Sequence, residues 1–258
     1  MRTEIIITTF GISEPTVNET LEGFERRFPQ IRIETQEVFP EVHLRLSPRL
    51  SSEKVHEDVL RDAIGWSRQQ LGAHFLSAQG ESMEAVVGCL LRRLQVSVAV
   101  AESCTGGLIS HLLTNVPGSS DYFLMAGVTY SNKAKQQLLG VSEQTLRRCG
   151  AVHENTAAEM AVGIRRISGA SYGLATTGIA GPTGGSREKP VGTLCVGLAG
   201  PQGVNSRKYV FAFPDRLMNK KIFAATALDL LRKQLLVGIT DSDRGDALCG
   251  GKPGPAGT

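Results

Sequence analysis

Alternating apolar and polar positions in the first third of the chain predict a small α/β unit. Three segments are rich in β-branched residues or alternate with a period of two, as strands do: residues 3–9, 31–38 and 41–50. Residues 13–28 and 52–72 instead carry apolar side chains at helical spacing, which predicts helices. We therefore expect a first domain over residues 1–78.

A break of small residues, 77–82, is followed by a longer alternation of strands and helices. The predicted helices are residues 83–94, 108–113, 131–140, 142–150, 154–169 and 215–236. The predicted strands are residues 97–102, 122–131, 171–181, 192–200 and 206–213. This order indicates a three-layer α/β domain with a mixed sheet over residues 79–240. The remaining residues, 241–258, are rich in glycine and proline and predict a disordered tail.

Charge and hydropathy indicate which kinds of binding partner are not expected for this chain. The 28 basic and 25 acidic residues are distributed along the chain without a cationic stripe, so nucleic acid is not an expected partner. Because no apolar run reaches the roughly 18 residues of a membrane span, we expect no membrane association. The N-terminus lacks a signal-like segment, and the five cysteines are an odd number without a CxxC pair. These features favour a cytoplasmic protein.

Hydroxyl groups and glycines gather where the predicted strands end. The clusters are Ser103 and Thr105, Ser119 and Ser120, Tyr130 and Ser131, and Thr176 and Thr177. Each cluster alone is typical of a helix cap or turn. Ligands of open α/β sheets bind beyond the carboxyl ends of strands, where free helix N–H groups suit anions. The repetition therefore favours a site for a phosphorylated small molecule.

Phosphate-binding loops, metal sites and a cysteine nucleophile have less support in the sequence. The glycines of "TGIAGPTGG", residues 177–185, form neither a Walker A loop nor a GxGxxG fingerprint. The five histidines show no HExxH or other paired spacing, so no metal site is predicted. Cys104 precedes a predicted helix, where a reactive thiolate is favoured, but a buried inert cysteine is the commoner outcome.

A serine and a lysine could together perform hydrolysis without a metal. A buried lysine can lose its proton near neutral pH and then act as a base toward a serine hydroxyl. Lys133 and Lys135 follow the strand that ends near Tyr130, and Ser131 shares a helical face with Lys135. Ser119 and Ser120 lie at the other end of that strand. Spacing does not choose among these serines, and a solvated helix lysine is the alternative for Lys135.

Six motifs occur in order between about residues 81 and 238: "AESCTGG", "PGSSDYF", "GVTYSNKAK", "GAVHENTAAEMA", "TTGIAGPTGG" and "KPVGT". Together they resemble the C-terminal domain of the CinA family. The residues before them, especially "TTFGISE", resemble the KH-like middle domain of long CinA proteins. The resemblance implies a KH-like α/β domain followed by an amidohydrolase domain.

The resemblance also implies an activity. The domain would hydrolyse the carboxamide of nicotinamide mononucleotide to nicotinate mononucleotide and ammonia, in pyridine nucleotide salvage, without a metal or other cofactor and as a homodimer. It implies a catalytic dyad of Ser120 and Lys135, assisted by Tyr130, with Arg216 on the phosphate. The full set of implied substrate-binding residues is Ser103, Thr105, Gly106, Asn132, Thr177, Gly178 and Arg216.

Two departures leave alternatives open. Long CinA proteins carry a further N-terminal domain with ADP-ribose pyrophosphatase activity, which we do not expect in this chain. Residues 1–80 contain no GxxG loop of the kind that RNA-binding KH domains use, which opposes an RNA-binding adaptor and favours a spacer or oligomer contact. The main alternative to the amidase is a non-catalytic nucleotide-binding module.

Overall fold

The computed structural model describes residues 4–49 and 56–237. The chain divides into two compact units between Val86 and Val87, within helix α4 (Met83–Arg93). The domain boundary predicted from the sequence, after residue 78, lies before this helix. Two predicted segments fall outside the described residues: the tail, residues 241–258, and the first residues of the helix predicted over 52–72.

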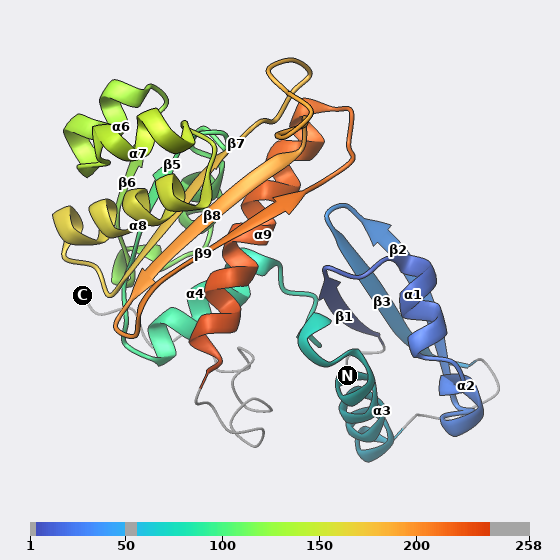
Figure 1. The fold of residues 1–258 in the computed structure, drawn as a ribbon. Helices are drawn as coiled ribbons and strands as arrows, with labels where there is room; N and C mark the ends of the chain where they lie inside the picture. Colours follow the sequence, from blue (N-terminus) through green and yellow to red (C-terminus); the bar gives the residue numbers. More distant parts are fainter. Residues whose placement is uncertain (1–3, 50–55, 238–258) are drawn as a thin grey trace. The chain divides into compact units, whose positions relative to one another are not determined.

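The first unit is a four-stranded antiparallel sheet with helices (Figure 1). Its elements are β1 (Ile5–Phe10), α1 (Glu14–Thr20), α2 (Phe24–Arg27), β2 (Ile31–Val38), β3 (Glu41–Pro48), α3 (Glu57–Leu71), η1 (Gly72–His74) and β4 (Phe75–Ser77). The strand order is β2-β3-β1-β4. Apolar side chains from the sheet and the helices form one core, in which Trp66 of α3 packs against Phe24 and Phe28. Burial of these side chains stabilises the unit.

Two local features of this unit differ from the sequence prediction. The helix predicted over residues 13–28 is divided into α1 and α2, because Gly23 adopts a left-handed backbone conformation with φ of 86°. Strand β4 was not predicted. Its three residues are too few to show a period, and its pairing with β1 is a long-range contact.

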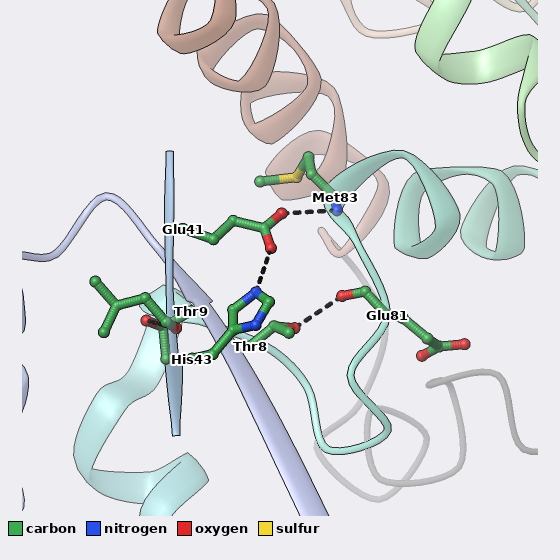
Figure 2. Close-up of polar contacts among 7 residues, drawn as sticks. Thr8, Thr9, Glu41, His43, Glu81 and Met83 are labelled. Atoms are coloured by element: carbon green, nitrogen blue, oxygen red, sulfur yellow. Dashed lines mark hydrogen bonds and ion pairs between the residues drawn. The ribbon is translucent and has the colours of Figure 1, made fainter. Parts of the chain in front are cut away.

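Polar side chains connect the sheet of this unit to the start of α4 (Figure 2). One carboxylate oxygen of Glu41 lies 2.9 Å from His43 Nε2, and the other accepts a hydrogen bond from the Met83 N–H at 3.1 Å. Thr8 Oγ1 donates to the carbonyl oxygen of Glu81 at 2.9 Å. Burial of the Glu41 carboxyl raises its pKa above the usual value. Glu41 therefore satisfies one of the free N–H groups at the start of α4.

The second unit is a five-stranded mixed sheet with helices on its faces (Figure 1). Its strands are β5 (Val98–Glu102), β6 (Phe123–Val128), β7 (Tyr172–Gly178), β8 (Thr193–Gly200) and β9 (Gly203–Val210). Its helices after α4 are α5 (Leu108–Thr114), η2 (Ser119–Asp121), α6 (Asn132–Leu139), α7 (Glu143–Cys149), α8 (Glu154–Ser168) and α9 (Arg216–Leu235). The strand order is β6-β5-β7-β8-β9, with β6, β5 and β7 parallel and the last two strands antiparallel.

Helix α8 packs very closely on one face of this sheet. Alanines from β5, β7 and β8 form a core with Met160, Ala161 and Ile164 of α8. Gly197 of β8 faces the α8 backbone so closely that an added Cβ would lie 2.1 Å from the carbonyl oxygen of Ala157. Small residues on the sheet thus allow the helix backbone to approach.

The predicted fold class is confirmed: the chain is mixed α/β, with two sheets and helices packed on them. The helices of the second unit start and stop at the expected signals, such as Ser131 and Gly140 around α6. Strand β9 begins at Gly203, three residues before the predicted start, because a tight hairpin pairs it with Gly200 of β8. Of the helices in the described ranges, none combines the length and apolar character that a membrane crossing needs.

Candidate active site

The "ESCTGG" motif forms the turn between β5 and α5. Strand β5 ends at Glu102, and its neighbours hold the chain just beyond it. The Ser103 N–H donates to the carbonyl oxygen of Thr176 on β7 at 3.0 Å, and the Thr129 N–H donates to that of Glu102 at 2.8 Å. Because the three strands are parallel, their carboxyl ends meet at one edge of the sheet. Ser103 lies at the centre of that edge, where ligands of open α/β sheets bind.

The Glu102 side chain fixes the same turn by binding the start of α5. Its buried carboxylate accepts hydrogen bonds from the backbone N–H groups of Gly107, Ile109 and Ser110 at 2.9, 3.1 and 2.9 Å, and from Ser110 Oγ at 2.5 Å. These N–H groups are the free donors at the start of α5. An acidic residue therefore occupies the N-terminus of α5, and the turn that carries Ser103 is rigidly held.

Lys135 reaches this turn from α6. Its side chain is 0% exposed, so the alternative of a solvated helix lysine is wrong. Its Nζ donates to Ser103 Oγ at 3.0 Å and to the carbonyl oxygens of Thr129 at 2.8 Å and Tyr130 at 3.4 Å. The side chain points back toward the N-terminus of its helix, as long helical side chains do. No carboxylate is among these partners.

Burial lowers the pKa of the Lys135 ammonium below its usual value of 10.5. Transfer from water disfavours the charged form, and the serine and carbonyl partners carry no compensating negative charge. A larger fraction of neutral amine is therefore available at a given pH than for a lysine in water. A neutral amine within hydrogen-bonding distance of a hydroxyl can act as its base.

Cys104, the neighbour of Ser103, has the opposite character. It is buried, and burial raises the pKa of its thiol to about 12. The thiolate is therefore scarce at neutral pH, as expected for an inert structural cysteine. The only nucleophilic side chain that Lys135 contacts in the described part of the chain is Ser103.

The structure does not bring the predicted pair, Ser120 and Lys135, together. Ser120 lies in η2, before the first residue of β6, whereas Lys135 follows the last. A six-residue strand separates the two positions by roughly 20 Å. Ser120 is also exposed, and it lies near the amino ends of the parallel strands, whereas Ser103 lies at their carboxyl ends. Within one chain, the serine that contacts Lys135 is Ser103. The expected pairing of Ser120 with Lys135 is therefore wrong within a single chain.

Tyr130 and Arg216 lie near one another beside this edge. Arg216, the first residue of α9, donates from Nη2 to Tyr130 Oη at 3.3 Å and from Nη1 to the carbonyl oxygen of Gly181 at 2.6 Å. The backbone of Tyr130 in turn contacts Lys135 Nζ. The guanidinium is exposed and retains donors for an anion. These contacts connect Arg216, the predicted phosphate-binding residue, to Ser103 and Lys135.

The remaining predicted substrate-binding residues divide into two groups. Thr105 and Thr177 are buried and engaged within the protein: the first shares a hydrogen bond with Thr176, and the second donates to the carbonyl oxygen of Ala151. Gly178 is partly exposed, and a Cβ there would lie 2.4 Å from the carbonyl oxygen of Thr193. Gly106 and Asn132 are exposed at the same edge. The backbone of Gly178 and both residues of this second group are therefore accessible to a ligand, whereas Thr105 and Thr177 are not; a binding role for each of these residues stays a prediction.

The family resemblance implied that Ser103 binds substrate but not that it is the partner of Lys135. Motif order alone offered several serines, and the contact joins residues 32 positions apart. The available signal was the parallel order of β5 and β6, which places Ser103 and the chain after β6 at the same edge. Among the described residues, no group of three or more His, Cys, Asp or Glu side chains is placed to hold a metal ion.

Comparison with known proteins agrees with this architecture. The profile of the CinA C-terminal domain matches residues 80–235. A CinA-like protein from Desulfosudis oleivorans is 51% identical over 230 residues, which cover 89% of this chain and 56% of the relative. One from Desulforapulum autotrophicum is 48% identical over 231 residues, covering 90% and 55%. The chain belongs to the CinA family, and it spans about half the length of these curated relatives.

Solved structures show the same fold for the second unit. The competence/damage inducible protein CihA from Agrobacterium tumefaciens is 40% identical, with a TM-score of 0.54, covering 58% of this chain and 95% of that one. A CinA superfamily protein from Escherichia coli is 30% identical, with a TM-score of 0.56, covering 63% and 98%. The match covers nearly the whole of each solved chain.

Proposed function

We propose that the second unit is a nicotinamide-nucleotide amidase, which hydrolyses the carboxamide of nicotinamide mononucleotide to nicotinate mononucleotide and ammonia. This activity would belong to pyridine nucleotide salvage in the cytoplasm. The observation that carries the proposal is the 3.0 Å contact between Ser103 Oγ and the buried Lys135 Nζ. A serine next to a lysine of lowered pKa is suited to acyl transfer without a metal.

The reaction then follows from this pair. Neutral Lys135 takes the proton from Ser103 Oγ, which forms a bond to the carboxamide carbon and gives a tetrahedral oxyanion. The C–N bond breaks as the Lys135 ammonium delivers its proton to the leaving ammonia. Lys135 next takes a proton from water, whose oxygen attacks the acyl-serine ester. Breakage of the ester returns the proton to Ser103 and releases nicotinate mononucleotide.

The polar groups around the pair would hold the substrate. Tyr130 and Arg216 form a connected donor pair beside the reacting groups, and the guanidinium fork suits a phosphate. Glu102 would keep the Ser103 turn in place, because its carboxylate is bound by four donors of α5. The proposal therefore places the substrate across the carboxyl edge of the sheet, with its amide at Ser103.

The test is to incubate the purified chain with nicotinamide mononucleotide and a chelator, and to measure ammonia and nicotinate mononucleotide. We expect release of both in equal amounts, resistant to the chelator and lost in a Lys135→Met variant. Thermal unfolding of that variant, followed by circular dichroism, checks that it folds. Full turnover by a folded Lys135→Met variant would overturn the mechanism. No release by wild-type protein that binds the nucleotide would support the non-catalytic binding module instead.

We further infer that the chain forms a homodimer through strand β6. This strand is at the edge of its sheet, and its side chains Leu124, Met125 and Val128 are 51, 39 and 52% exposed. An edge strand with exposed apolar side chains is a typical site of association. Light scattering should give twice the chain mass for wild type and the chain mass for a Leu124→Asp variant. A monomeric wild type at micromolar concentration would contradict the inference.

A further inference from the structure

The first two turns of α9 carry two basic residues on one side of the helix. Arg216 and Lys220 are four positions apart, so their side chains are neighbours on the helix surface. Arg216 contacts Tyr130 and Gly181 beside the active-site edge. Lys220 was not distinguished by any sequence motif. Its place in the fold nevertheless joins it to the same edge.

Lys220 reaches the turn that carries the nucleophile. A Cβ added to Gly106 would lie 3.6 Å from Lys220 Nζ, so the ammonium is next to the exposed side of this glycine. The Gly106 N–H in turn donates to the carbonyl oxygen of Ser103 at 3.2 Å. Ser103 and Gly106 are thus the two ends of a single tight turn, and the Lys220 ammonium lies beside its Gly106 end.

The charge of Lys220 is not neutralised by the protein. In the described ranges, no acidic side chain forms an ion pair with Lys220, whereas Arg232 and Lys233 at the far end of α9 both pair with Asp229. The nearest acid along the turn is Glu102, whose carboxylate is directed to the donors of α5. Two cations, one connected to Tyr130 and one next to Gly106, therefore lie beside this edge without an ion-pair partner among the described residues.

We propose that Lys220 and Arg216 together bind the phosphate of the substrate, with Lys220 the residue that selects a mononucleotide over the corresponding nucleoside. This inference rests on the proposed function. A phosphate monoester carries up to two negative charges, which a guanidinium fork and a mobile ammonium complement in different ways. Arg216 would hold two phosphate oxygens, and Lys220 would supply a point charge from the side of Gly106.

The test compares Lys220→Met with Lys221→Met, its exposed neighbour on the same helix. Calorimetry would measure the affinity for two ligands that do not turn over, nicotinate mononucleotide and nicotinate riboside. Loss of one charge-assisted contact predicts that Lys220→Met weakens mononucleotide binding by about tenfold or more relative to riboside binding. The same variant should raise KM for nicotinamide mononucleotide more than it lowers kcat. Lys221→Met should match wild type in every measurement.

Three binding results would overturn the inference: equal affinity of Lys220→Met and wild type for nicotinate mononucleotide, an equal loss for both ligands, or no binding of nicotinate mononucleotide by wild type. A fall in kcat alone would place Lys220 in the chemical step and also overturn it. Failure of the proposed amidase is a separate result. If wild type binds nicotinate mononucleotide but releases no ammonia from nicotinamide mononucleotide, the activity fails, while the affinity of Lys220→Met for nicotinate mononucleotide still decides the phosphate site.

Discussion

The Nζ of Lys135 lies 3.0 Å from Ser103 Oγ, although 32 positions separate the two residues in the chain. The contact exists because β5 and β6 are parallel neighbours, so the residue after β5 and the helix after β6 share one edge of the sheet. Lys135 has exchanged its contact with water for one hydroxyl and two carbonyl oxygens. This geometry decides which serine the proposed chemistry uses.

Two serine variants should differ sharply in activity. We expect Ser103→Ala to lower kcat by at least about a thousandfold, because the nucleophile is lost and only binding and electrostatic effects remain. We expect Ser120→Ala to keep most of the activity, because Ser120 lies at the opposite edge of the sheet. Ammonia release by each variant measures this directly. The reverse order of effects would restore Ser120 as the nucleophile and would require it to reach Lys135 from a second chain.

The proposed mechanism predicts that activity increases with pH. Because Lys135 must be neutral to accept the serine proton, kcat/KM should rise with pH through the lowered pKa of this lysine and reach a plateau below pH 10.5. The same shift affects stability: between the lowered pKa and 10.5 the unfolded chain binds more protons, so stability should rise with pH in that window. Rate profiles and urea unfolding at several pH values measure the two effects. An activity independent of pH from 6 to about 10 would count against Lys135 as the base.

Close helix-to-sheet packing predicts a large effect of one methyl group. Gly197→Ala should destabilise the second unit by about 3 kcal/mol, because the new Cβ would lie 2.1 Å from the Ala157 carbonyl oxygen and α8 would have to move. Gly127→Ala in β6 is the matched control. Its Cβ would meet only Ile164 Cδ1 at 4.0 Å, and we expect a change within about 0.5 kcal/mol. Urea unfolding followed by circular dichroism would show equal effects if the packing were loose.

The Glu41 contacts predict how the stability of the first unit depends on pH. Since burial raises the Glu41 pKa, the folded unit binds more protons than the unfolded chain between 4.5 and the raised value. Stability should therefore decrease as pH rises through this window, and Glu41→Gln should remove that part of the slope. Trp66 is the only tryptophan and packs in the core of this unit, so its fluorescence reports the unfolding. Identical slopes for the variant and wild type would contradict the prediction.

Local patterns determined most of the elements. Ser131 and Gly140 mark the ends of α6 because a side-chain cap and a left-handed glycine are local requirements of a helix. The same reasoning failed at β4, whose three residues form a strand only through pairing with β1. It also failed at Gly23, where a helical pattern continues in the sequence although the backbone turns. The family resemblance named Ser103, Lys135 and Arg216 but paired Lys135 with Ser120, whereas the structure pairs it with Ser103.

The sequence by itself determined the fold class, the order of most elements, the family and the cluster of hydroxyl, lysine and arginine residues that forms the candidate site. These features follow from periodicity, capping and motifs, which are properties of neighbouring residues. Only the tertiary structure decided that Ser103 rather than Ser120 meets Lys135, that Lys135 is buried, and that Lys220 lies beside Gly106. Strand order and helix packing set those distances, and both depend on contacts between segments far apart in the chain.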